Sequence, residues 1–407
     1  DRDEEVWLVE GISELACPVN GLRAWYSETV SEAFAEQPDK QLNTWVMEAD
    51  QAMAQYGASY LFVVYFLDRF GEDSTRALVA HPENGVKSID AVLSSLGDEM
   101  GFEELYADWV VANYINDASL ADGRYSYVSL EPPPFKPDAE YKAVDLPVEQ
   151  VTNVSQYGTD YIVLAGEGDY QIDFAGDTLV RLMPTSAHSG TYAWWGGQGT
   201  HSDTTLTGEF DLTAVQTATL RFFTWYEIME DYEYGYVEVS TDGEWWTTLP
   251  GQTTTSEDPN GSNLGHGYTG YSGGWIEEVA DLTPYAGEEV LIRFQYLTDE
   301  GPVRVGWLLD DIAIPELDFW DDVETGKGNW VAEGFNRNAL ILPQEWLVQL
   351  VKLGDGQTTV EGLELNADNS GSWPVQLGAG ERAILVISGC TRVTTERADY
   401  WYRIAHR

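Results

Sequence analysis

The sequence is poor in cysteine and in long apolar runs. Its 407 residues include two cysteines, Cys17 and Cys390, near opposite ends of the chain, which excludes a small disulfide-stapled scaffold. We therefore expect two free thiols. The longest apolar run, residues 60–67, ends at Asp68 and is far shorter than a membrane-spanning helix. No secretory leader is recognisable, as we expect if the chain is a fragment that has lost one.

Positive charge is also scarce. The chain has 69 acidic residues against 21 Lys and Arg, a formal net charge of −48. This excludes binding to nucleic acid or to an anionic membrane through charge, and it favours cation binding. The length predicts two to four domains, and an aromatic content of 13% excludes a disordered chain.

Paired histidines are absent. The five histidines are widely separated, and no two lie within four residues of each other (His81, His188, His201, His266 and His406). The sequence therefore contains no His-Glu-x-x-His motif, and it also lacks Gly-x-Ser-x-Gly, a phosphate-binding glycine loop and Cys-x-x-Cys. A complete catalytic constellation cannot be assembled from local motifs alone.

The segment 4–16 predicts an amphipathic helix. Its apolar residues recur near a 3.6-residue period (Trp7, Leu8, Ile12 and Leu15). Glu10 and Glu14 are four residues apart, so they lie on one face a turn apart. This pair is either solvated surface acid or part of a site.

The order of the patterns predicts an α+β multidomain chain. Residues 1–130 read as a helical subdomain, with further helices over 56–70, 89–96 and 102–116, the second of these beginning after Ser88 as its N-cap. Residues 22–36 form either a short helix or an ordered loop. A proline-rich stretch then opens an extended linker or edge segment over about 131–150. Short alternating strands follow, predicting a jelly-roll-like β-sandwich that ends at 317 and a smaller, Ig-like sandwich over 318–407.

The sequence around the first helix resembles the second half of a gluzincin zinc site. Trp-Leu-x-Glu-Gly-x-Ser-Glu is followed by Pro-Asp-x-Gln-Leu-Asn-x-Trp at 38–45 and by Tyr-Gly-Ala-Ser-Tyr-Leu-Phe at 56–62, as in the helical subdomain of secreted bacterial gluzincins of the hyicolysin kind. The resemblance implies that Glu10 is the third zinc ligand and that Glu14 orients a zinc-bound histidine. It implies that Tyr56, or less favourably Tyr60, donates to an oxyanion.

A second resemblance lies in the predicted jelly roll. Ser-Gly-Thr-Tyr-Ala-Trp-Trp-Gly-Gly at 189–197 and Gly-Trp-Leu-Leu-Asp-Asp-Ile at 306–312 are similar to the MAM-like domain of immune inhibitor A-like metallopeptidases. That resemblance implies a structural Ca²⁺ site with Asp173, Asp310 or Asp311 as ligands, and Asp203 as a weaker choice. An aromatic tract in this region forms either the sandwich core or a sugar-stacking platform (Trp194, Trp195, Trp245, Trp246, Tyr268, Tyr271 and Trp275).

The resemblances together predict the C-terminal part of an extracellular zinc metallopeptidase that acts on a protein or peptide substrate. Because the two histidine ligands and the general base are missing, we expect the isolated chain to be inactive. The alternative is a secreted or cell-surface binding protein whose β-sandwiches hold a glycan or another protein. Peptide specificity, oligomeric state and the role of residues 318–407 do not follow from the sequence.

Overall fold

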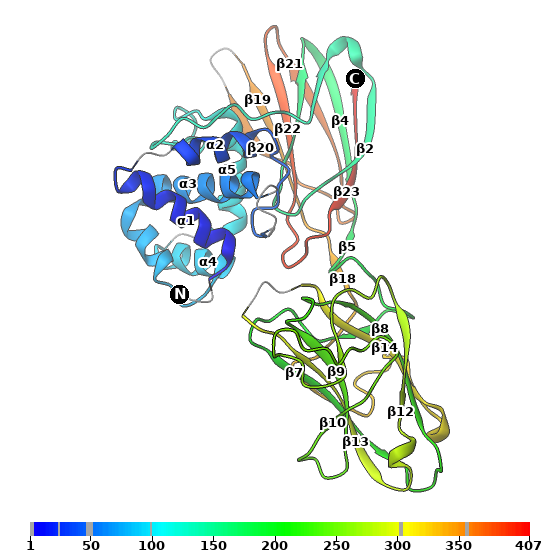
Figure 1. Cartoon of the computed structure of the whole chain (residues 1–407). Coiled ribbons are helices and arrows are strands. Elements are labelled where there is room, and N and C mark those ends of the chain that lie inside the picture. The colour runs from blue at the N-terminus through cyan, green and yellow to red at the C-terminus, as the bar shows by residue number, and fades with distance from the viewer. Residues whose placement is uncertain (1–3, 23–24, 46–51, 98–99, 301–303, 355–357) are drawn as a thin grey trace. The chain divides into compact units, whose positions relative to one another are not determined.

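The computed structural model describes residues 4–22, 25–45, 52–97, 100–300, 304–354 and 358–407 (Figure 1). The chain forms two compact units. Unit 1 contains residues 1–182 and 342–407, and unit 2 contains residues 183–341. Unit 2 is thus inserted into the sequence of unit 1. Among the described residues, no helix is long and apolar enough to cross a membrane.

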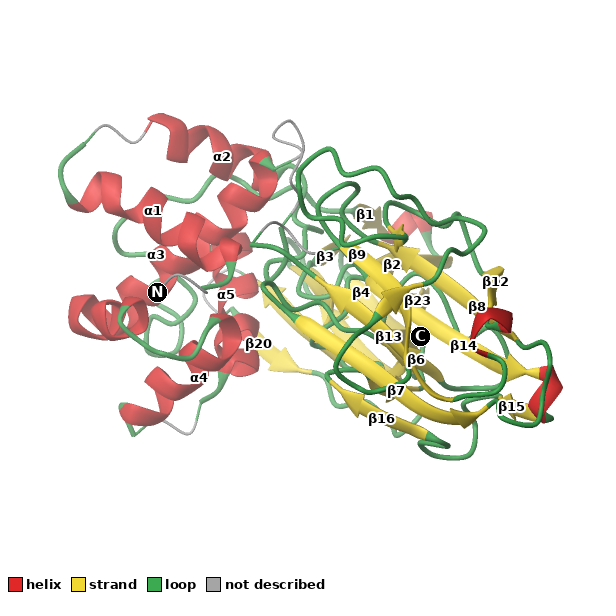
Figure 2. Cartoon of the chain, turned by 60° about the horizontal axis from the view of Figure 1, so that its bottom comes forward, coloured by secondary structure: helices red, strands yellow, loops and turns green. Residues whose placement is uncertain are grey.

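Unit 1 begins with five α-helices in the described part of the chain. They are α1 (Val6–Val19), α2 (Trp25–Ala35), α3 (Met53–Val79), α4 (Gly85–Ser95) and α5 (Phe102–Ile115). The fully apolar middle of α3 is surrounded by the other helices, and residues 61–66 are completely buried. Figure 2 shows the helices gathered in one cluster. The predicted helical subdomain is confirmed.

Two local details differ from the sequence prediction. The chain continues in helical conformation beyond Gly71, which interrupts α3 with a φ of 80°. Helix α4 begins at Gly85, and the hydroxyl of Ser88 donates to the carbonyl of Gly85 at 2.7 Å. Ser88 therefore lies inside the helix, and the prediction that it is the N-cap is wrong.

The remainder of unit 1 is a β-sandwich. One sheet contains, in spatial order, β1 (Ala139–Lys142), β3 (Asp160–Ala165), β22 (Arg382–Gly389), β19 (Trp346–Leu353) and β20 (Thr359–Gly362). The other contains β2 (Val148–Val154), β23 (Ala398–His406), β4 (Gly168–Gly176) and β21 (Ser370–Leu377). Each sheet therefore combines strands from before and after the insertion. A short 3₁₀ helix, η1 (Ala143–Asp145), connects β1 to β2.

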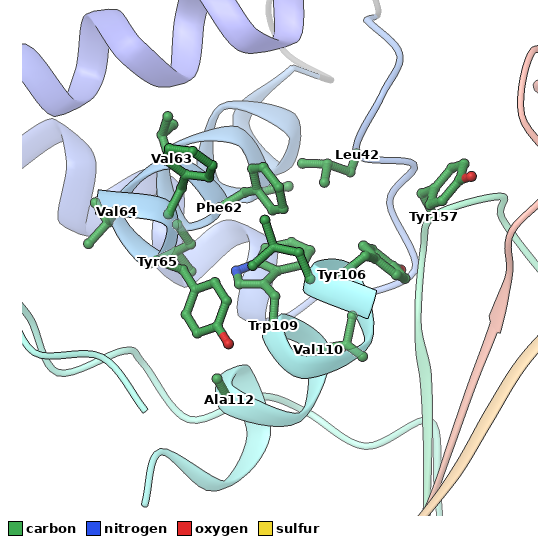
Figure 3. Packing of buried hydrophobic residues seen from close by; sticks show 14 of the residues in the cluster. Leu42, Phe62, Val63, Val64, Tyr65, Tyr106, Trp109, Val110, Ala112 and Tyr157 are labelled. Atoms are coloured by element: carbon green, nitrogen blue, oxygen red, sulfur yellow. The ribbon is translucent and has the colours of Figure 1, made fainter. Parts of the chain in front are cut away.

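The helices share a hydrophobic core with the first sheet of this sandwich. Tyr106 on α5 lies in one buried cluster with Tyr157, which directly precedes β3 (Figure 3). The Tyr106 hydroxyl donates to the carbonyl of Gly158 at 3.1 Å, and the side-chain amide of Gln349 donates to the carbonyl of Ala107 at 3.0 Å. Buried polar contacts of this kind fix the position of a helix on a sheet.

Unit 2 is a second β-sandwich. One sheet contains β10 (Thr247–Thr248), β9 (Tyr234–Ser240), β13 (Glu289–Leu297), β7 (Asp203–Asp211) and β16 (Trp330–Glu333), with β11 (Gly267–Tyr268) beside β9. The other contains β12 (Ile276–Asp281), β8 (Thr219–Glu227), β14 (Gly306–Ile314), β6 (Ala193–Trp195) and β17 (Asn336–Asn338), with β15 (Phe319–Asp321) beside β14. Two short 3₁₀ helices lie in the connections between strands: η2 (Thr283–Tyr285) between β12 and β13, and η3 (Pro315–Leu317) between β14 and β15. The predicted class, helices followed by two β-sandwiches, is confirmed.

The predicted boundaries need correction. The stretch 131–150 contains β1, which is an edge strand of its sheet, and the first three residues of β2, so the edge-segment alternative holds for part of it. Residues 318–341 belong to unit 2 rather than to a separate tail. The tail strands do not form a sandwich alone, because β23 pairs with both β2 and β4. The chain passes between the units at β5 (Leu179–Arg181) and β18 (Ile341–Pro343), which form a separate two-stranded sheet.

Candidate functional site

Helix α1 places Glu10 and Glu14 beside α3. Its buried side chains, Trp7, Leu8 and Leu15, form one stripe, and the two glutamates lie half-buried at the margin of that stripe. The helices approach so closely that no side chain fits between them at Gly11, where a β-carbon would lie 2.6 Å from the carbonyl oxygen of Ser59 on α3. The glycine between the two acids is thus required by packing.

Two tyrosines lie close to Glu10. Burial, followed by the negative charge of Glu10, raises the pKa of Tyr56 above its ordinary value. Burial and the charges of Glu14 and Glu10 do the same to the pKa of Tyr26. The Tyr56 ring packs edge-on against Trp45, with 4.7 Å between the ring centres. Tyr56 therefore keeps its proton at neutral pH and is able to donate a hydrogen bond.

The Glu10 carboxylate is available as a ligand. It accepts no hydrogen bond from another described residue, and burial followed by the charge of Glu14 raises its pKa. Glu14, in contrast, accepts a hydrogen bond from the Ser27 hydroxyl at 2.9 Å. Its partner in this chain is a serine on α2. A half-buried carboxylate without a partner, next to a bonded one, is an arrangement that a cation would stabilise.

The histidines of the chain do not complete a metal centre with Glu10. His188 bonds to Asp311, His406 bonds to the carbonyl of Ala143, and the remaining three lie in other loops. Within the described ranges, no group of three or more His, Cys, Asp or Glu side chains is arranged to hold a metal ion. The described residues therefore bring no histidine together with Glu10 in a group of this kind.

The four aspartates predicted to bind Ca²⁺ lie on three strands, and Asp173 is outside the jelly roll to which the prediction assigned it. Asp173 lies on β4 of unit 1, where it bonds to Ser372, so it is not part of the jelly roll. Asp203 lies on β7 and accepts a hydrogen bond from Gln295 at 2.7 Å. Asp310 and Asp311 lie on β14, which belongs to the other sheet of unit 2.

Asp310 and Asp311 instead form hydrogen bonds with the loop that contains His188 and Ser189. Asp310 accepts backbone hydrogen bonds from His188 and Ser189, and Asp311 lies 2.6 Å from the His188 ring nitrogen Nδ1. Burial raises the pKa of Asp310 to about 7. The His188 ring stacks on Phe223 at 3.6 Å. The sequence showed the paired aspartates, but not the histidine more than 120 residues away that one of them contacts.

Sequence reasoning also missed an acidic cluster in unit 1, in which Asp160 is buried, Asp39 is half-buried and Asp138 is exposed. Asp39, Asp138 and Asp160 line a cavity of about 470 Å³ at the junction of the helices and the sandwich. Arg397 forms an ion pair with Asp39, and the Tyr400 hydroxyl donates to Asp160 at 2.6 Å. Burial, with the charges of Asp138 and Asp39, raises the pKa of Asp160 to about 8. No sequence pattern links these residues, because they come from three distant segments.

The aromatic tract of unit 2 divides into two groups. Trp194 and Tyr268 are fully buried in the sandwich core, as the core interpretation expects. Trp246 packs on the Arg293 guanidinium at 3.9 Å. Only Trp245 and Tyr271 stand well exposed, at 80% and 65%. The tract is therefore mainly structural.

The fold of unit 2 and its strand pattern define a MAM-like jelly roll. Residues 179–339 match the family model described as immune inhibitor A-like, MAM domain. These residues coincide closely with the inserted unit. The resemblance that the sequence motifs predicted is confirmed for this part of the chain.

Three curated relatives share similarity with part of the chain. Pre-pro-metalloprotease PrtV of Vibrio cholerae is 31% identical over 164 residues, which cover 39% of this chain and 17% of the relative. Immune inhibitor A of Bacillus thuringiensis subsp. alesti is 30% identical over 152 residues, covering 36% and 21%. Bacillopeptidase F of Bacillus subtilis is 28% identical over 108 residues, covering 26% and 6%. The chain thus matches a small part of each relative, and its similarity is to protease-associated regions.

Proposed function

We propose that this chain is part of an extracellular zinc metallopeptidase, and that Glu10 is one of its metal ligands. The observation that carries the proposal is the unbonded, half-buried Glu10 carboxylate beside Glu14 and Tyr56. Two of the relatives that resemble unit 2 are named as a metalloprotease and as immune inhibitor A, which supports the same conclusion. The remaining ligands and the general base would come from outside these 407 residues.

Each residue of the site has a distinct task in this proposal. A bound zinc ion would supply Lewis acidity toward the scissile carbonyl and a reactive water. Glu10 holds one coordination position, and Glu14 lies one turn further along α1, where its hydrogen bond to Ser27 fixes its orientation. Tyr56 remains protonated and donates a hydrogen bond to the oxygen that becomes negative as water adds to the peptide carbonyl.

The experiment compares this chain with the longer protein that contains it. We expect the longer protein to bind zinc and to hydrolyse a casein substrate, and the 407-residue chain alone to do neither. Robust hydrolysis by the isolated chain would refute the division of ligands that we propose. The exposed Glu289, on β13 of unit 2, offers a matched control, since Glu289→Gln changes the net charge as Glu10→Gln does.

The exposed rings of Trp245 and Tyr271 favour a second function for unit 2, the binding of glycan. In this case the helical part would be a peptidase remnant without activity. A glycan array probed with the full chain and with Trp245→Ala and Tyr271→Ala tests it. Binding that neither substitution weakens would exclude these rings as the platform.

A further inference from the structure

A pocket of about 510 Å³ opens in unit 1 between the beginning of α1, the loop before α4 and the loop that follows β22. Its apolar wall includes Val6, Trp45 and Val86, and its polar wall includes Glu5 and Glu83. The volume exceeds that of any single side chain, and the pocket is formed entirely by residues of one compact unit.

Two residues of the pocket wall, Val6 and Trp45, connect it to the Glu10 site. Val6 precedes Glu10 by four residues on α1, so the two lie one above the other on the same helix face. Trp45 lines the pocket and also packs on the ring of Tyr56, at 4.7 Å between ring centres. A peptide whose carbonyl lies between Glu10 and Tyr56 would therefore place a neighbouring side chain in this pocket.

Two cations, Arg392 and Lys87, line the pocket, and the charge of Arg392 is already neutralised. Arg392 donates to both carboxylate oxygens of Glu103, at 2.7 and 2.6 Å, and to Asp90 at 3.2 Å. Two carboxylates thus hold one guanidinium, and little positive charge remains for a ligand. Lys87, on the first turn of α4, also lines the pocket, but its side chain is exposed to solvent, which screens its charge.

The negative charge of Glu5 is less well compensated. Its Oε2 atom accepts a hydrogen bond from the indole of Trp7 at 2.6 Å, and its carboxyl group lies over Gly85, where a β-carbon would be 2.1 Å from the Glu5 Cδ atom. Burial and then the charge of Glu4 raise the pKa of Glu5, and these effects outweigh Lys87. An incoming cation would offset this unfavourable charge.

We propose, on the basis of the function proposed above, that this pocket is the subsite for a basic side chain, arginine or lysine, of the peptide substrate. The aliphatic stem lies along Val6 and Val86 and across the face of Trp45, and the charged group reaches Glu5 with Glu83 at the rim. The chain's net charge of −48 also attracts basic peptides over longer distances. Amphipathic basic side chains match this combination of an apolar wall and the Glu5 carboxylate at its edge.

The test is a ligand-observed NMR titration of the 407-residue chain, with EDTA present, using two blocked peptides, acetyl-Ala-Arg-Ala-amide and acetyl-Ala-Leu-Ala-amide. We expect the arginine peptide to bind more tightly. Glu5→Gln, which keeps the acceptor for Trp7, should weaken the arginine peptide about tenfold because it removes one charge-assisted contact. Glu289→Gln is the matched control and should leave the affinity unchanged. Trp45→Ala should weaken binding without altering net charge.

Each other outcome contradicts the proposal. Equal or tighter binding of the leucine peptide would make the pocket an apolar subsite, and an arginine affinity that Glu5→Gln does not alter would remove Glu5 from it. Absence of binding at millimolar concentration would reject the subsite. Because zinc is chelated throughout, peptide binding in this test does not depend on the zinc content that tests the proposed function. Failure of the subsite proposal is therefore distinguishable from failure of the proposed function.

Discussion

Gly11 of α1 meets the main chain of α3 at Ser59, and a β-carbon on Gly11 would lie 2.6 Å from the Ser59 carbonyl oxygen. Such a distance is not tolerated by real side chains, so the two helices can approach only at a glycine. The contact lies between Glu10 and Glu14 in sequence. It therefore sets how far both carboxylates stand from the tyrosines of α2 and α3.

Gly11→Ala should destabilise unit 1 by about 1–3 kcal/mol, the range for overpacking a tight contact. It should also weaken zinc binding by the longer protein, because α1 must move outward. Urea unfolding monitored by circular dichroism measures the first effect. Gly362→Ala on β20 is the control, since its β-carbon would meet nothing within 4 Å. Equal stability of the two variants would contradict the close contact.

The buried Asp160 should make stability depend on pH. Its folded pKa of about 8 lies above the ordinary value of 3.8, so the folded chain retains a proton that the unfolded chain releases. The free energy of unfolding should therefore fall as the pH rises from about 4 to about 8. Asp160→Asn should flatten this decline by about 1 kcal/mol or more. Urea midpoints of the wild type and of Asp160→Asn at pH 5 and pH 9 measure this difference. The same change with pH in both proteins would contradict the role of Asp160.

The two thiols should differ in reactivity. Cys390 is buried beneath the helical layer, and burial raises the pKa of its thiol well above the usual range. Cys17 is half-exposed on α1. Ellman's reagent should therefore modify one thiol per native chain and two after denaturation. Peptide mapping should place the native label on Cys17, and rapid labelling of Cys390 would contradict the packing of this core.

Much of the helical part was predictable from the sequence, because helix signals are local. The apolar stripe of residues 7, 8 and 15 follows the 3.6-residue period, and the structure buries those residues. The inserted arrangement was not predictable. β23 pairs with β2 and β4 across more than 220 residues, and strand periodicity carries no information about its partner. Asp173 was therefore assigned to the wrong sandwich.

The candidate site likewise has features that the local sequence predicts and features that depend on contacts between distant segments. Glu10 and Glu14 are candidates that the sequence predicts because their spacing is local, and their neighbour Tyr56 is a candidate through its motif. The partner of Glu14, Ser27, and the acidic cluster around Asp160 depend on contacts between distant segments. Arg397 forms an ion pair with Asp39, which lies 358 residues earlier in the chain. Such contacts arise only when the sheets close, so they appear in the structure alone.

The most direct test of the central claim is the zinc content of the longer protein that contains this chain, purified as wild type, Glu10→Gln and Glu14→Ala. The wild type should hold one zinc ion per chain and hydrolyse casein. Glu10→Gln should lose both, whereas Glu14→Ala should bind zinc about 10–100-fold more weakly, as expected for an orienting carboxylate. Unchanged zinc in Glu10→Gln would contradict the assignment of Glu10 as a ligand.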